Sequence, residues 1–171
     1  MINRDAYTFP SIYVEGAHGT KHICYDGVSF KYVPHVEALT DCESTFSLIP
    51  YERVIEYIDL VQAKMNASVL VVWEIPGESE HKGFLISRDS SICLQEVAGQ
   101  FIYLLVSEGS RVAKGGRVAY QVTNKLEVRN VYSNCEGKVA FIIDMTWETP
   151  RKVLLVVIPG ELREVIVRKG S

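Results

Sequence analysis

The stretch EGSRVAKGGRVAYQVTNKL, residues 108–126, carries the strongest structural signal in this chain of 171 residues. Gly109 permits a tight turn after a β-prone run, and Gly115 permits a second turn a few residues later. Apolar residues then alternate along residues 117–122, as in a strand with one buried face. A short polar break and a further β-prone run follow. The sequence therefore predicts a hairpin with Lys125 at or beside its tip.

Short β-prone segments fill the chain from residue 68 to its end, with Gly, Asn, Asp, Glu and Ser between them. This spacing favours a sandwich or barrel of short strands over alternating strands and helices. The predicted strands are Ser68–Ile75, Phe84–Ser87, Ile92–Val97, Phe101–Val106, Arg117–Val122, Glu127–Val131, Lys138–Ile143, Val153–Ile158 and Glu164–Val167. The polar segment 76–83 is predicted to be a surface loop.

One segment has a helical pattern instead. Apolar residues recur at spacings of four, three and four, and polar residues fill the other side; the apolar set is Val54, Ile58, Val61 and Met65. The sequence therefore predicts one amphipathic helix over Tyr51–Met65, about four turns long, with Val54, Ile58 and Val61 buried against a sheet. Residues 7–48 before it are a broken series of β-prone pieces.

The composition excludes several classes of function. Lysine and arginine number 18 against 21 aspartates and glutamates, so no basic excess is available to neutralise a run of phosphates, and we expect no nucleic-acid partner. No apolar run approaches the roughly 18 to 20 residues that span a bilayer, and the first residues lack the pattern of a signal peptide. We therefore expect a cytoplasmic protein without a membrane partner.

Four cysteines, at positions 24, 42, 93 and 135, are widely spaced and form no Cys-x-x-Cys pair. We expect free, mostly buried thiols, as a reducing compartment permits. Cys135 precedes a turn glycine and is the best candidate for an exposed thiol, but no base lies near it in the sequence. We therefore predict no catalytic residues, and an enzyme is the less favoured class.

A zinc site is an alternative use of the N-terminal cysteines. His18, His22 and Cys24 lie close together, and His35 or Cys42 would complete a tetrahedral set of nitrogen and sulfur ligands. The spacing matches no common zinc pattern, and His18 lies in a glycine-flanked loop. Scattered surface histidines and a buried cysteine are the favoured interpretation, so we predict no metal site.

The region around residues 108–126 resembles the biotinyl/lipoyl-attachment family, over about residues 100–158. In that family a glycine, a valine three residues later and a second glycine precede a lysine that follows the first glycine by sixteen residues. The matching positions are Gly109, Val112, Gly115 and Lys125, followed downstream by Ser133, Gly137 and Val139 and by two runs like the closing strands, Phe141–Ile143 and Val153–Ile158. The resemblance implies a barrel-sandwich hybrid and makes Lys125 the candidate attachment site for biotin or lipoate.

Three departures from the family pattern bear on function. Asn124 and Leu126 flank the lysine, where biotin-carrying lysines have methionines and lipoate-carrying ones follow an acidic residue. The stretch between Lys125 and Gly137 is one residue longer than usual, and residues 145–150 replace a glycine-valine turn. We therefore do not expect biotin or lipoate on Lys125, although the fold inference holds.

The predicted fold is mainly β: a biotinyl/lipoyl-like hybrid with the C-terminal strand over residues 100–171, and a β-rich N-terminal extension with the helix over residues 1–99. The two parts are expected to pack as one compact unit.

The leading functional class is a non-enzymatic carrier-like or protein-interaction module with a protein partner. The alternative is a small-molecule-binding or enzymatic protein that uses the N-terminal part, with the barrel as scaffold; it requires a pocket near His22, Cys24 and the helix. Exposed strand edges are compatible with either a monomer or a dimer.

Overall fold

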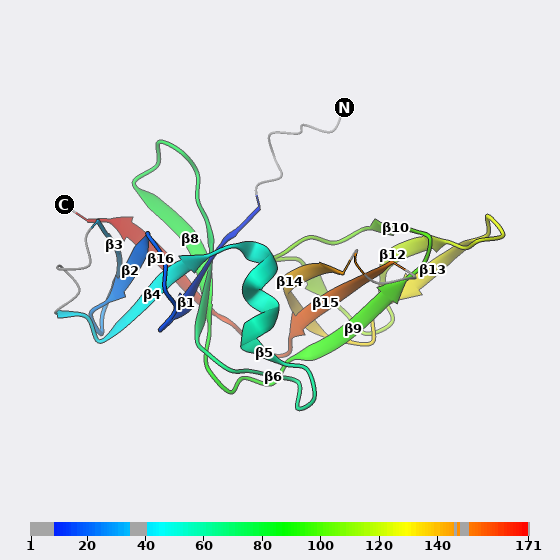
Figure 1. The fold of residues 1–171 in the computed structure, drawn as a ribbon, viewed down its shortest axis with the longest axis horizontal. Coiled ribbons are helices and arrows are strands. Elements are labelled where there is room, and N and C mark those ends of the chain that lie inside the picture. The colour runs from blue at the N-terminus through cyan, green and yellow to red at the C-terminus, as the bar shows by residue number, and fades with distance from the viewer. Residues whose placement is uncertain (1–8, 35–40, 146, 148–150, 171) are drawn as a thin grey trace. The chain divides into compact units, whose positions relative to one another are not determined.

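The computed structural model describes residues 9–34, 41–145, 147 and 151–170, and in these residues the fold is mainly β-sheet with one short helix (Figure 1). The chain divides into two compact units. Unit 1 comprises residues 1–58, 65–89 and 162–171, and unit 2 comprises residues 59–64 and 90–161. Among the described residues, no helix has the length and hydropathy of a transmembrane span.

Unit 1 is a closed barrel of seven strands in the order β1-β4-β2-β3-β16-β8-β7. Its strands are β1 (Ser11–Glu15), β2 (His22–Tyr25), β3 (Phe30–Val33), β4 (Ser44–Ile49), β7 (Val69–Trp73), β8 (Glu80–Ile86) and β16 (Arg163–Lys169). β7 pairs with β1 and closes the circle, and all pairs are antiparallel except β16 with β3. Closure leaves no free sheet edge in this barrel.

The barrel interior is filled by large apolar side chains from every strand except β8, whose Leu85 packs against the cluster from a partly buried position. The buried members are Tyr13, Ile23, Phe30, Phe46, Leu70, Val72, Val165 and Val167. On β7 the inward residues Leu70 and Val72 alternate with Val69 and Val71, which are also fully buried. This is why residues 68–75 read as an almost unbroken apolar run rather than an alternating one.

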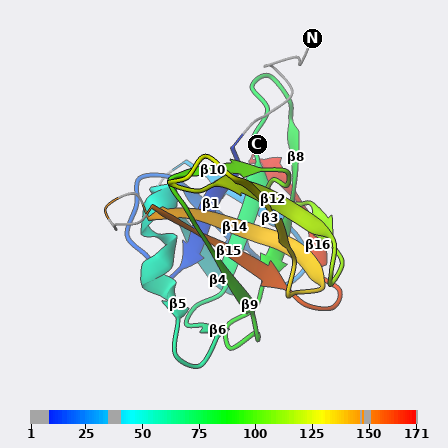
Figure 2. The same cartoon turned by 90° about the vertical axis from the view of Figure 1, so that its right-hand side faces the viewer.

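Unit 2 is a two-layered β structure, and Figure 2 shows β10 and β12 in one layer and β14 and β15 in the other. The first sheet has the order β10-β12-β13 and the second β11-β14-β15-β9. The strands are β9 (Cys93–Ala98), β10 (Phe101–Leu104), β11 (Arg111–Val112), β12 (Arg117–Val122), β13 (Val128–Tyr132), β14 (Gly137–Met145) and β15 (Lys152–Ile158). Both sheets contribute to one core, which includes Val118, Ala119, Val139 and Leu155.

The predicted helix is wrong in length and type. It is a 3₁₀ helix, η3 (Tyr51–Tyr57), followed by the short strands β5 (Ile58–Asp59) and β6 (Lys64–Met65). The Asp59 carboxylate accepts hydrogen bonds from the backbone N–H groups of Val61 and Gln62, at 3.0 and 2.9 Å, and so favours a turn over a further helical turn. Val54 and Ile58 are buried as predicted, but Val61 lies on this turn and is 96% exposed.

The predicted domain boundaries also need correction. The C-terminal strand β16 pairs with β3 and β8 and therefore belongs to unit 1, not to the hybrid at residues 100–171. The segment 76–83 is not wholly a loop, because β8 begins at Glu80 and buries His81. The start of this strand was not predicted because its sequence is polar: the exposed Glu80 and Lys82 alternate with the buried His81 and Gly83. The expected packing of the two parts as one unit stays a prediction.

The expectation of free thiols is wrong, because the structure has two disulfides, Cys24–Cys42 and Cys93–Cys135. Pairing of β2 with β4 brings the first two cysteines to a Cα separation of 5.4 Å, and the second pair is 5.9 Å apart. Both separations suit a disulfide. Cys135 is buried rather than exposed. The sequence separations of 18 and 42 residues gave no local signal, because only strand pairing creates these neighbours.

Gly137, at the start of β14, is the glycine of unit 2 whose replacement should destabilise the fold most. Its φ is +146°, and an added Cβ would collide with the backbone carbonyl of Ile158. Gly160 also has a positive φ, +82°, but open space around it. We expect Gly137→Ala to lower the free energy of unfolding by about 3 kcal/mol or more, and Gly160→Ala by about 1 to 2 kcal/mol. Urea unfolding measures both, and equal losses would contradict the packing described.

Candidate functional site

Lys125 lies where the sequence predicts it, in the turn of the hairpin that joins β12 to β13, and it is exposed. The last paired residues are Val122 and Val128. Thr123 closes the turn: its N–H donates to the Glu127 carbonyl at 2.9 Å, and its carbonyl accepts from the N–H of Leu126 at 2.9 Å. The turn therefore has a defined backbone, from which the lysine side chain extends into solvent.

Leu126, next to Lys125, has an unusual backbone and an unusual exposure. Its φ is +61°, a left-handed conformation that costs a non-glycine residue about 1 to 2 kcal/mol. Its apolar side chain is nevertheless 76% exposed. Strain of this kind persists where the surrounding structure imposes it, and it often occurs at sites that contact a ligand or partner. The tip thus combines an ammonium group with a projecting apolar side chain.

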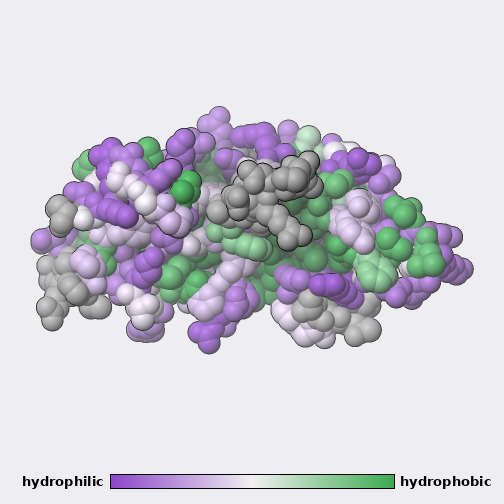
Figure 3. Space-filling model, turned by 90° about the horizontal axis from the view of Figure 1, so that it is seen from above, coloured by the Kyte–Doolittle hydropathy of each residue, from purple (hydrophilic) through white to green (hydrophobic). Residues whose placement is uncertain are grey.

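The outer face of the sheet β10-β12-β13 is apolar, and we call it the outer apolar face. Ile102, Leu104 and Val131 point to the core, so their neighbours along the strands point outward. The outward residues include Phe101, Tyr103, Leu105, Tyr120, Val122, Val128 and Tyr132. Tyr103 and Tyr120 stack across the strands with ring centroids 4.8 Å apart. In Figure 3 hydrophobic side chains gather at the right-hand end, where Figure 1 places this sheet.

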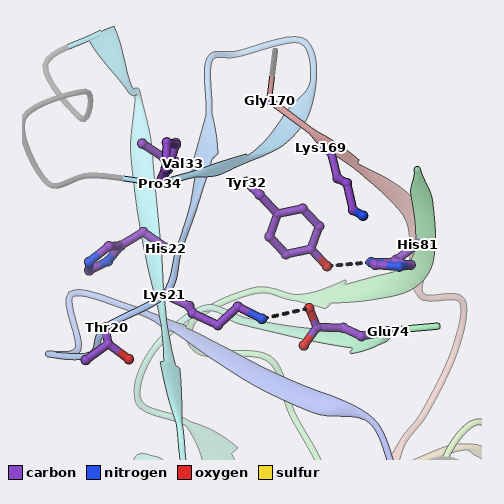
Figure 4. A pocket seen from close by; sticks show the side chains of 10 residues that line it. All are labelled: Thr20, Lys21, His22, Tyr32, Val33, Pro34, Glu74, His81, Lys169 and Gly170. Carbon is purple, nitrogen blue, oxygen red and sulfur yellow. Dashed lines mark hydrogen bonds and ion pairs between the residues drawn. The ribbon is translucent and has the colours of Figure 1, made fainter. Parts of the chain in front are cut away.

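Unit 1 has a pocket of about 390 Å³ beside the barrel end, and Figure 4 shows its lining. The alternative function requires a pocket near His22, Cys24 and the helix; His22 lines this pocket, whereas Cys24 and the helix η3 do not. The side chains of Lys21, Tyr32, Glu74 and His81 converge there, with Lys169 close to them. They come from the residue before β2, from β3, from the residue after β7, and from β8 and β16. The remaining lining residues are Thr20, His22, Val33, Pro34 and Gly170.

Glu74 is the centre of the hydrogen-bond network in this pocket, which we call the Glu74 network. The hydroxyl of the fully buried Tyr13 donates to the carboxylate, 3.1 Å from each oxygen. The ammonium group of Lys21 lies 3.6 Å from one oxygen. Burial by itself raises the pKa of Glu74, but the surrounding donors outweigh it and hold the pKa below its usual range; these donors are Ser11, Tyr32, Lys21 and Tyr13. Glu74 is therefore ionised at neutral pH.

Tyr32 and His81 extend the network. Nε2 of His81 lies 3.0 Å from the carbonyl oxygen of Ile75, which can only accept, so this nitrogen carries a proton. The Tyr32 hydroxyl lies 2.9 Å from Nδ1, the other ring nitrogen of His81. Burial and the charge of Glu74 raise the pKa of both Tyr13 and Tyr32 far above the usual value. Both phenols stay protonated and serve as donors.

The zinc hypothesis fails at its sulfur ligands, because Cys24 and Cys42 form a disulfide. Nδ1 of His22 lies 2.8 Å from the Ser47 hydroxyl. His35 lies outside the described residues. Within the described part of the chain, no three His, Cys, Asp or Glu side chains are placed to hold a metal ion.

Sequence reasoning missed the Glu74 network because its members lie far apart in the chain. One signal was present: Glu74 is a carboxylate at the end of the apolar run 68–75, where a buried strand leaves little access to water. A charged group in such a place needs donors around it. His81 gave no signal, since its neighbours in the sequence are polar.

Comparison with known protein families gives a family match for this chain. Residues 7–161 match the model of the DUF2118 family, which is described as an uncharacterized protein conserved in archaea. The chain belongs to this family, since the match covers most of its length. A search of the curated proteins finds no match.

Removal of the Glu74 charge should change stability in a pH-dependent way. Because the pKa of Glu74 is lower in the folded protein than its value of 4.5 in the unfolded chain, its stabilising effect is complete above about pH 4.5. That effect disappears as the pH falls through the folded value. We expect Glu74→Gln to lower the free energy of unfolding at pH 7 by about 1 to 3 kcal/mol. Near pH 2, where Glu74 of the wild type is protonated, the substitution should change the free energy of unfolding much less.

Chemical denaturation from pH 2 to pH 7 checks this expectation. Glu78→Gln is the matched control, because Glu78 is an exposed carboxylate in the loop before β8. Curves for Glu74→Gln and the wild type that remain parallel over the whole range would show that ionisation of Glu74 contributes nothing to the pH dependence of stability.

Proposed function

We propose that unit 2 is a biotinyl/lipoyl-like barrel-sandwich hybrid that works as a carrier-like protein-interaction module, and that a partner protein recognises its β12–β13 hairpin tip. Two sheets around one core support this assignment. So do the positive φ angles of Gly109, Gly115 and Gly137, the three glycines of the family-like pattern. Fold likeness alone does not give a function, so the argument depends on the surface of the hairpin.

The observation that carries the proposal is the apolar surface beside Lys125. Six large side chains of the outer apolar face and the tip are between 46% and 76% exposed: Phe101, Tyr103, Leu105, Leu126, Val128 and Tyr132. At roughly 150 to 250 Å² per large side chain, their exposed parts amount to about 600 Å². Apolar patches of this size on a monomer often mark interaction sites. The aromatic content is also typical of interface centres.

The charge at the tip indicates what kind of partner fits. Arg129 is paired with Glu127 at 3.4 Å, whereas no ion pair of Lys125 is found among the described residues. A partner surface that is apolar at its centre and bears a carboxylate at its rim would match both the outer apolar face and the Lys125 ammonium group. The ion pair would contribute mainly to the rate and orientation of association, and the apolar contacts to affinity.

Covalent modification of Lys125 is tested separately from partner recognition. Lys125 is exposed, as a ligase requires, but its flanking residues differ from those of biotin- and lipoate-carrying lysines. We expect the intact mass of the protein from its native cells to show neither biotin nor lipoate. Lys125→Arg should change the free energy of unfolding by no more than about 0.5 kcal/mol, as is usual for exposed turn positions. A discrete added mass that Lys125→Arg removes would make the module a covalent carrier, and a loss of several kcal/mol would make Lys125 structural.

Site-specific photo-crosslinking tests the interaction surface. A photo-reactive residue at position 126 should crosslink one defined protein in native cells, and Lys125→Glu should suppress the crosslink by reversing the charge at the tip. The matched control carries the same residue at position 61, because Val61 is 96% exposed on the β5–β6 turn of the same unit. Equal yields at both positions, or a yield that Lys125→Glu leaves unchanged, would refute the proposed surface.

A further inference from the structure

The charges in the unit 1 pocket do not balance. Two ammonium groups, those of Lys21 and Lys169, line it, and among the described residues of the lining Glu74 is the only carboxylate. Lys21 is paired with Glu74 at 3.6 Å. Lys169, by contrast, has no ion pair among the described residues. The lysines and the carboxylate of the described lining therefore carry one positive charge in excess.

Glu74 cannot balance this excess, because its single negative charge is already paired with Lys21. Tyr13 donates to both carboxylate oxygens, and Ser11, Tyr32 and Lys21 also contribute to holding the carboxylate in its charged form. The Lys169 ammonium group, unpaired among the described residues, favours an anion over a cation as ligand. His81 is occupied at both ring nitrogens.

The shape of the pocket adds a second constraint. Its volume of about 390 Å³ lies within the range of small-molecule sites. Val33 and Pro34 form an apolar part of the lining, and Figure 4 shows them across the pocket from the Lys169 ammonium group. The Thr20 hydroxyl and the Lys21 ammonium group lie at another side. An apolar wall opposite a free cation suits a molecule with one anionic group and a compact apolar body.

We propose that this pocket binds a small organic anion, whose carboxylate or phosphate group pairs with Lys169 and Lys21 while its apolar part lies against Val33 and Pro34. The Glu74 network acts on the ligand indirectly. The ion pair with Glu74 holds the Lys21 side chain, and the hydrogen bond between Tyr32 and His81 holds the Tyr32 ring. This function of unit 1 is independent of the interaction module in unit 2.

The test uses the full chain labelled with ¹⁵N, at low ionic strength and neutral pH, titrated separately with three probes. Benzoate carries a carboxylate on an apolar ring, benzamide is its neutral counterpart, and inorganic phosphate is an anion without an apolar body. We expect benzoate to shift the amide signals of Lys21, Val33 and Gly170 in a saturable way, and benzamide to leave them unchanged. Shifts with benzoate alone identify a carboxylate ligand with an apolar body, whereas shifts with phosphate alone would contradict the proposed contact with Val33 and Pro34.

Variants at position 169 connect binding to the charge. Lys169→Gln should weaken binding by about five- to tenfold, whereas Lys169→Arg should keep the affinity within about twofold. Lys31→Gln is the matched control, because Lys31 is an exposed lysine of β3 that does not line the pocket. The proposal is overturned if benzamide binds as well as benzoate, if no anion gives saturable shifts at millimolar concentrations, or if Lys169→Gln binds like the wild type.

Discussion

The barrel of unit 1 depends on one long-range pairing, because its last strand comes from the end of the chain. β16 forms a parallel pair with β3 and an antiparallel pair with β8, and without it two strand edges would stay open. The chain therefore builds six barrel strands, continues through residues 90–161 of unit 2, and then returns to complete the barrel. The main part of unit 2 is thus an insertion between β8 and β16, and its short segment 59–64 lies between β4 and β7.

This arrangement gives the two units different kinds of site. The pocket of unit 1 needs the closed barrel, because Lys169 stands at the end of β16 while Tyr32 and His81 come from the strands on either side of it. The hairpin tip of unit 2 needs only two neighbouring strands and the core beneath them. A change that prevents β16 from docking would therefore dismantle the pocket directly and leave the hairpin's own contacts intact.

Burial has opposite consequences at the two sites. In unit 1 a carboxylate at the end of a buried strand stays charged because hydrogen bonds and the Lys21 ammonium group stabilise its charged form. In unit 2 the apolar side chains of the outer apolar face have no such internal partner and remain in contact with water. The groups without an internal partner among the described residues are consequently the Lys169 ammonium group in the pocket of unit 1 and mainly apolar side chains on the outer apolar face of unit 2.

The sequence by itself determined the strand-rich class and the β12–β13 hairpin with Lys125 at its tip. Both depend on signals within a few residues: alternation of apolar side chains, turn glycines and a polar break. The length of the short helix could not be predicted from the apolar spacing alone, because that spacing continues past the end of the helix. The Asp59 carboxylate accepts hydrogen bonds from the two N–H groups that follow and so favours a turn there. Only the tertiary structure decided the two disulfides, the place of β16 in the barrel and the Glu74 network. The first disulfide joins residues 18 positions apart, β16 pairs with a strand more than 100 residues before it, and the Glu74 network draws on several separate strands. Strand pairing and register, which no local pattern encodes, bring these residues together.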